Sequence, residues 1–123
     1  KDQIIKNVGV AYIDLNGLKA INDNYGHSKG DKFICTAADT FKMVFPDNSY
    51  RVGGDEFVII EQNIERDKYE ERITALKNIM QDKQVSISIG VLWREQVDDL
   101  EALLKSADKL MYMEKEMYHK NRE

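Results

Sequence analysis

The fold is decided by one stretch of the chain, Arg51-Val52-Gly53-Gly54-Asp55-Glu56-Phe57-Val58-Ile59-Ile60. Two apolar runs, at residues 50–52 and 57–60, flank a Gly-Gly pair, which predicts a β-hairpin with a tight turn and positive φ at the glycines. Two acidic side chains directly follow the glycines, so the tip of the hairpin combines bare backbone with carboxylates. This combination suits a metal-bound phosphate.

A strand is predicted upstream of the hairpin, at residues 6–14. Its apolar and small residues give no polar face, which is typical of a central strand buried on both sides. Asp14 closes this strand, at the edge where open α/β sheets commonly place residues that handle ligands. Taken alone, Asp14 is better explained as the cap of the next helix. The carboxylates of the hairpin favour a metal ligand instead.

A short helix is predicted between Gly17 and Gly26 from three apolar residues at helical spacing. Lys19 and Asn22 lie three residues apart and share another face of this helix. The amide of Asn22 has the donor and the acceptor needed to contact a purine edge. The alternative is that both residues are ordinary solvated surface residues.

The turn cluster at residues 26–31 leads into a second helix that Pro46 closes. Asp31 is expected at the N-cap of this helix, although an aspartate can also accept hydrogen bonds from N1 and N2 of guanine. The alternative for His27 is a structural role, in which its side chain orders the loop through a hydrogen bond. Cys35 falls within the apolar helical pattern and is expected to pack in the core.

The remainder of the chain predicts a charged amphipathic helix around residues 69–79, a strand at 85–91 and a long final helix. Asp98 and Glu101 resemble a capping box at the start of that last helix. The polar tail at residues 115–123 is expected to fray. This order predicts an α/β fold in which helices flank a mixed central sheet.

Length and composition predict one soluble domain spanning residues 1–123. The net charge of −4, without a basic stripe, argues against a nucleic-acid partner. No apolar run reaches the roughly 18 residues of a membrane helix, so no membrane contact is expected. A lone cysteine is consistent with a reducing cytoplasm. The chain begins at Lys1 without a methionine, so we expect a domain excised from a longer protein, without its N-terminal helix and an upstream sensory or regulatory domain.

Two motifs resemble the GGDEF family of diguanylate cyclases. All five signature letters are present from Gly53 to Phe57, and residues 14–31 are similar to the family's nucleotide-binding segment, in the right order before the hairpin. The resemblance implies a palm-like fold of the kind that nucleotidyl cyclases and many polymerases share. It also implies that two GTP molecules are joined into cyclic di-GMP with release of two pyrophosphates. A homodimer would carry one GTP on each copy, with two Mg²⁺ or Mn²⁺ ions per active site.

The resemblance also assigns the metal site. Asp14 and Asp55 match the metal-binding side chains, with the Leu15 carbonyl assisting. Glu56 lies beside them as a further ligand or an electrostatic partner. The signature glycines, Gly53 and Gly54, would let backbone approach the substrate.

The substrate contacts are assigned in the same way. Asn22 and Asp31 match the positions that read guanine, which implies GTP rather than ATP. Lys19 and Lys115 match contacts to phosphate, and His27 falls in the same substrate-binding segment.

The chain departs from the family pattern at several positions. Asn16 stands where relatives often carry a second aspartate, and Val44 replaces the arginine of the Arg-x-x-Asp product-inhibition site that ends here at Asp47. Feedback inhibition at that site is therefore expected to be weak or absent. Two other functions stay open beside the cyclase: a catalytically inactive, GTP-binding regulatory module, and a cyclase that makes a single-nucleotide cyclic product.

Overall fold

The computed structural model describes residues 4–122. Within this range no helix is both long enough and apolar enough to cross a membrane. The elements follow in the order β1 (Ile5–Leu15), α1 (Leu18–Tyr25), α2 (His27–Val44), β2 (Ser49–Arg51), β3 (Glu56–Glu61), α3 (Arg66–Asp82), β4 (Ile87–Val97) and α4 (Leu100–Arg122).

The four strands form one sheet in the order β2-β3-β1-β4. The predicted α/β class is confirmed, but every neighbouring pair of strands is antiparallel, where the element order predicted a mixed sheet. The helical connections join strands that point the same way, β1 to β2 and β3 to β4. Each of these connections passes over an intervening strand, so no two parallel strands become neighbours.

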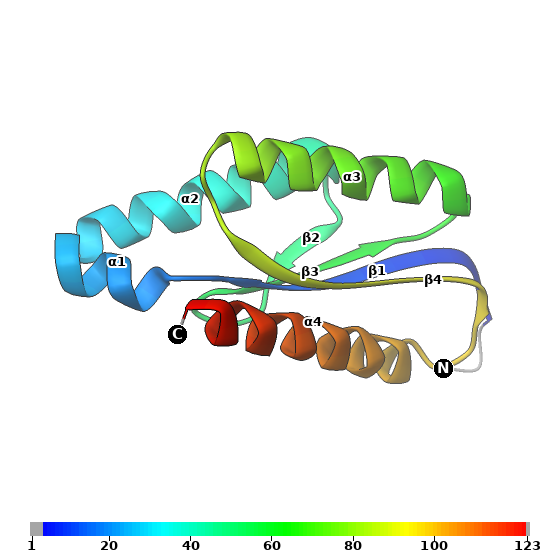
Figure 1. Ribbon diagram of the computed structural model, residues 1–123. Coiled ribbons are helices and arrows are strands. Elements are labelled where there is room, and N and C mark those ends of the chain that lie inside the picture. The colour runs from blue at the N-terminus through cyan, green and yellow to red at the C-terminus, as the bar shows by residue number, and fades with distance from the viewer. Residues whose placement is uncertain (1–3, 123) are drawn as a thin grey trace.

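The helices cover both faces of the sheet, with α2 and α3 on one side and α4 on the other, while α1 lies beyond the end of β1 and packs against α2 (Figure 1). The central strand β1 is therefore buried on both faces, as its apolar pattern predicted. Ala11 and Ile13 belong to the core beneath α2 and α3, whereas Val8 and Val10 belong to the core beneath α4. Asp14 and Leu15, at the end of this strand, are held by packing on both sides.

Helix α4 lies unusually close to β4 at Gly90. A Cβ atom on Gly90 would stand 2.0 Å from the Ala107 carbonyl oxygen and 2.6 Å from the Met111 amide nitrogen, so only glycine permits this approach. Lys115 follows Met111 by one helical turn. The contact at Gly90 therefore fixes the height of Lys115 above the sheet.

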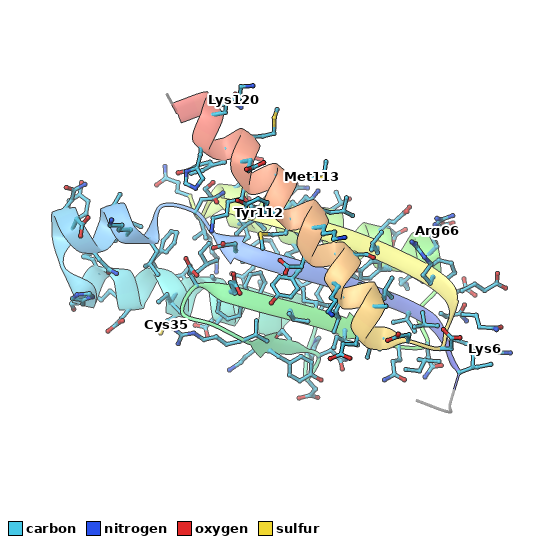
Figure 2. The ribbon with its side chains drawn as sticks, turned by 90° about the horizontal axis from the view of Figure 1, so that it is seen from below. Lys6, Cys35, Arg66, Tyr112, Met113 and Lys120 are labelled. Atoms are coloured by element: carbon cyan, nitrogen blue, oxygen red, sulfur yellow. The ribbon has the colours of Figure 1, made fainter. Side chains whose placement is uncertain are left out.

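Helix α2 begins earlier than predicted. Gly26 adopts φ 89° and ends α1 while it also precedes the first residue of α2, His27. The helix therefore already includes Asp31, which is not its N-cap as predicted, and His27 is helical rather than part of a loop. Cys35 is exposed, contrary to the expected packing (Figure 2). It lies on the side of α2 opposite Ala37 and Phe41, which point into the core.

Both ends of α4 also differ from the prediction. The Asp99 carboxylate, rather than that of Asp98, caps the helix by accepting a hydrogen bond of 3.1 Å from the Ala102 amide. At the other end the helix continues to Arg122, through the tail that was expected to fray. Lys115 and Tyr118 are half-buried, so this part of the helix rests on the protein rather than in solvent.

Candidate active site

The signature turn spans residues 52–55 between β2 and β3. Arg51 fixes it, because Nε donates to the Gly53 carbonyl at 3.1 Å and a terminal guanidinium nitrogen donates to the Gly54 carbonyl at 2.6 Å. Neither glycine has a positive φ, so the expectation of a left-handed tight turn was wrong. The reversal is spread over four residues, which removes the need for that conformation.

Three carboxylates meet where β1 and β3 run side by side. Asp14 lies opposite Glu56 in the antiparallel register, and the Leu15 amide donates to the Asp55 carbonyl at 2.9 Å. Asp14 is only 1% exposed, while Asp55 and Glu56 are half-buried. Backbone pairing therefore holds carboxylates from both motifs at one place.

Lys115 reaches this place from α4, on the same face of the sheet as the Asp14 side chain. Its Nζ atom donates to Asp14 Oδ2 at 2.6 Å, across 101 positions of sequence. Asp14 Oδ1 is buried and has no hydrogen-bond partner among the described residues. A buried carboxylate oxygen without a partner is unfavourable, so the site has an unmet demand for a cation or a donor.

The ionisation of the site reflects this crowding of charge. Burial, together with repulsion from Asp55, raises the pKa of Asp14 even though Lys115 opposes the shift. Burial also raises the pKa of Glu56, with repulsion from Asp14, Asp108 and Asp55 adding to it. The hydrogen bond to Asp14 raises the pKa of Lys115 against the effect of its burial. The three carboxylates together therefore favour a positive charge beside them.

A cleft of about 400 Å³ opens beside these residues. It brings together five of the residues assigned from the sequence: Asp14, Leu15, Lys19, Asp55 and Lys115. Asp23, Tyr118 and His119 also line it, although the sequence analysis did not propose them. Their spacing could have indicated them, because Asp23 lies four residues after Lys19, and the other two lie three and four residues after Lys115.

Asn16 ties the end of β1 to the start of β4. Its amide nitrogen donates to Ser86 Oγ at 3.0 Å, and its amide oxygen accepts from Ser88 Oγ at 2.9 Å. The Asn16 backbone amide also donates to the Ser86 carbonyl at 2.9 Å. Asn16 is buried, so this residue orients the segment that carries Asp14. The sequence analysis had noted Asn16 only as a departure from the family pattern.

The residues assigned to guanine lie outside the lining of that cleft, on the α1–α2 hairpin. Asn22 Oδ1 is buried without a hydrogen-bond partner among the described residues. It faces the backbone of α2 so closely that a Cβ on Gly30 would stand 1.8 Å away. Asp31 and His27 are exposed on α2. The side chain of Asn22 therefore lies against α2 at Gly30, the residue that precedes Asp31.

The donor set fits a divalent cation that a substrate helps to bind. The described residues contain no group of three His, Cys, Asp or Glu side chains arranged to hold a metal by themselves. Mg²⁺ is usually held by one or two protein carboxylates together with substrate phosphates and water. Asp14 and Asp55 could supply such a pair, because Asp14 Oδ1 has no hydrogen-bond partner within the described part of the chain.

Comparison with known proteins identifies the family. The family model described as "Diguanylate cyclase, GGDEF domain" matches residues 2–121. The chain therefore belongs to the GGDEF diguanylate cyclase family, as the two motifs predicted.

Individual relatives agree with this assignment. Signaling protein YkoW of Bacillus subtilis is 38% identical over an alignment of 124 positions, which covers 89% of this chain and 15% of that protein. Diguanylate cyclase DgcS of Shewanella oneidensis is 34% identical over an alignment of 115 positions, which covers 88% of this chain and 39% of that protein. The active GGEEF domain of a diguanylate cyclase from Vibrio cholerae superposes with a TM-score of 0.73 at 26% identity, over 88% of this chain and 76% of that structure. The chain thus spans well under half the length of these two curated relatives.

Proposed function

We propose that this domain condenses two GTP molecules into cyclic di-GMP, with release of two pyrophosphates. The observation that carries the proposal is the meeting of Asp14 and Asp55 in a cleft, where Asp14 Oδ1 is buried without a hydrogen-bond partner in residues 4–122. Each 3′-hydroxyl attacks the α-phosphorus of the other nucleotide, so a new P–O bond forms as the bond to pyrophosphate breaks. Such displacements depend mainly on positioning and on neutralising phosphate charge.

The carboxylates are the metal ligands in this proposal. Asp14 and Asp55 hold Mg²⁺ or Mn²⁺, two ions per active site, with the Leu15 carbonyl assisting and Glu56 beside them. Bound divalent ions neutralise phosphate oxygens and stabilise the attacking and leaving oxygens. The cluster supports this role, because burial and, to a smaller extent, repulsion from Asp55 raise the pKa of Asp14, and an added cation would offset both effects.

The remaining residues bind and orient the nucleotide. Lys19 and Lys115 contact the triphosphate in this proposal, which their position in the lining of the same cleft as Asp14 and Asp55 supports. Asn22 and Asp31 read the guanine edge in this proposal, since the amide of Asn22 carries both a donor and an acceptor and the carboxylate of Asp31 can accept from guanine N–H groups. Gly53 and Gly54 leave the signature turn free of side chains beside the substrate. His27 is assigned to the same binding segment.

Catalysis requires two copies of the domain in this proposal, since each copy presents one nucleotide to the other. A regulatory or sensory domain elsewhere in the parent protein is proposed to control that encounter. The relatives support this organisation, because the matching segment covers only 15% of YkoW and 39% of DgcS.

The second candidate is a GTP-binding regulatory module without catalysis. One observation favours it: the relative with 38% identity is described as a signalling protein rather than as a cyclase. Both candidates use the same cleft and differ only in whether the bound nucleotide reacts.

Product identification separates these candidates. The chain at high concentration is incubated with GTP and Mg²⁺, beside Asp14→Asn, and the nucleotides are identified by chromatography and mass. Cyclic di-GMP from the unaltered chain alone is the expected result. A single-nucleotide cyclic product would replace the proposal with the other cyclase reaction. GTP that is bound but left intact, also in the longer parent protein, would favour the regulatory module.

A further inference from the structure

The ion pair between Lys115 and Asp14 differs from the other two that join described side chains. Arg66–Glu70 is an exposed contact within one helix, and Arg72–Glu61 joins partly exposed groups at 3.6 Å. In the pair between Lys115 and Asp14 the carboxylate is almost fully buried and the two atoms are 2.6 Å apart. The lysine thus contacts the very carboxylate to which the proposed function assigns a metal ion.

We propose that Lys115 occupies the place of the divalent cation at Asp14 while the cleft is empty, and leaves Asp14 for the triphosphate when the metal–nucleotide complex binds. This inference rests on the proposed function, since it concerns the metal and the phosphate of the same site. It adds that the ammonium of Lys115 pairs first with the Asp14 carboxylate and then with the triphosphate.

The burial of Asp14 explains why a stand-in cation is needed. A buried carboxylate without a counter-charge is strongly unfavourable, and Asp55 and Glu56 add negative charge nearby. The ammonium of Lys115 supplies the missing charge in the absence of metal. It contacts only Oδ2, however, and no other group of residues 4–122 donates a hydrogen bond to Oδ1. A divalent ion brings twice the charge to the same carboxylate.

The position of Lys115 allows it to leave. Its side chain is 34% exposed, and a flexible four-carbon stem carries the charge. Lys115 lines the 400 Å³ cleft beside Asp14 and also borders an open hollow with Tyr112, Glu116 and His119. The ammonium can therefore turn into the cleft without any movement of α4. A phosphate in that cleft would receive it.

Two opposite effects on binding follow from this exchange. A metal ion alone must compete with Lys115 for Asp14, so it binds weakly. A metal ion with a triphosphate meets no such competition, because the phosphate accepts the released ammonium. Removal of the lysine charge should therefore strengthen binding of the metal alone and weaken binding of the metal–nucleotide complex.

The test measures Mn²⁺ binding without nucleotide, from the loss of the free Mn²⁺ signal in electron paramagnetic resonance. We expect Lys115→Met to bind Mn²⁺ about tenfold more tightly than the unaltered chain, because the competing charge is gone. Lys115→Arg keeps a cation at the end of a long flexible side chain and should bind Mn²⁺ like the unaltered chain. Lys105→Met is the matched control, since Lys105 is exposed on α4, about 15 Å away along the helix, and its loss changes the net charge equally. It should leave Mn²⁺ binding unchanged.

The same variants titrated with Mg²⁺ and GTP complete the test, with Lys115→Met expected to bind the complex more weakly. A lysine with only a structural role would weaken binding in both titrations, and a lysine that only contacts phosphate would leave Mn²⁺ binding unchanged. Either result would overturn the inference. Asp14→Asn separates the two proposals: if it abolishes Mn²⁺ binding while Lys115→Met does not strengthen it, the exchange fails and the metal site stands. If Asp14→Asn has no effect, the metal site itself is wrong.

A measurement on the unaltered chain decides the matter if Lys115→Met does not fold. Reductive methylation followed by mass spectrometry reports how freely each lysine reacts. Mn²⁺ added without nucleotide should raise the reactivity of Lys115 and leave that of Lys105 unchanged. An unchanged rate at Lys115 at saturating Mn²⁺ would contradict the exchange.

Discussion

Gly90→Ala should loosen α4 from the sheet. The added Cβ would stand 2.0 Å from the Ala107 carbonyl oxygen and 2.6 Å from the Met111 amide, whereas ordinary van der Waals contact begins at 3.4 Å. The helix must therefore rise by more than an ångström, since both obstructing atoms are backbone and cannot turn aside. Overpacking of a core costs about 1–3 kcal/mol, and obstruction by backbone places this substitution near about 3 kcal/mol.

Urea unfolding followed by circular dichroism measures this loss. At about 3 kcal/mol, the unfolding midpoint of Gly90→Ala should fall by roughly 1–2 M. Gly54→Ala is the matched control, because its added Cβ meets nothing within 4 Å, and it should change the free energy of unfolding by less than about 0.5 kcal/mol. If Gly90→Ala unfolds within about 0.5 kcal/mol of the unaltered chain, α4 does not lie on β4 as described. The placement of Lys115 would then fall with it.

Three further predictions concern the core, the carboxylates and the base. Tyr69→Phe removes a buried hydroxyl that donates a hydrogen bond to the Val10 carbonyl. It should lower the free energy of unfolding, measured in urea, by about 1–3 kcal/mol without changing nucleotide binding. An unchanged unfolding midpoint would contradict that hydrogen bond. Burial and neighbouring carboxylates raise the pKa of Glu56, so the folded state holds the proton of this carboxyl more tightly than the unfolded state does. The free energy of unfolding therefore falls as pH rises from the ordinary pKa of a glutamate to the raised pKa in the folded state. Glu56→Gln should therefore gain stability over the unaltered chain from pH 4 to pH 7 in thermal unfolding, and a constant difference would refute the shift. Asp31→Ala should relax the preference for GTP over ATP in a competition binding assay, and an unchanged preference would refute its assignment.

Local patterns in the sequence predicted most elements of the fold. The unbroken apolar run of β1 correctly indicated a strand buried on both faces, and the helical stripes correctly indicated all four helices. The predictions failed where burial depends on the direction in which a residue points from its helix, and where the start of a helix depends on one capping residue. Cys35 lies on the side of α2 opposite the buried Ala37 and Phe41, and Gly26 lets α2 begin at His27 without the cap expected at Asp31.

The contacts that build the site could not be predicted from local patterns, because they join distant segments. The hydrogen bond between Lys115 and Asp14 spans 101 positions, and that between Ser88 and Asn16 spans 72. The direction of neighbouring strands is likewise a property of the whole sheet, which explains why a mixed sheet was expected where all pairs are antiparallel. Resemblance to the GGDEF family supplied the site residues instead, and the structure brings Asp14, Asp55 and Lys115 into one cleft.

A crystal structure with Mn²⁺ and a non-reactive GTP analogue would show whether the proposed metal and nucleotide sites exist. Anomalous scattering would locate the metal. We expect Mn²⁺ in contact with the carboxylates of Asp14 and Asp55 at about 2.0–2.2 Å, close to the Mg²⁺ distance, with the guanine edge against Asn22 and Asp31. A metal bound elsewhere, or a triphosphate outside the cleft lined by Lys19 and Lys115, would contradict it.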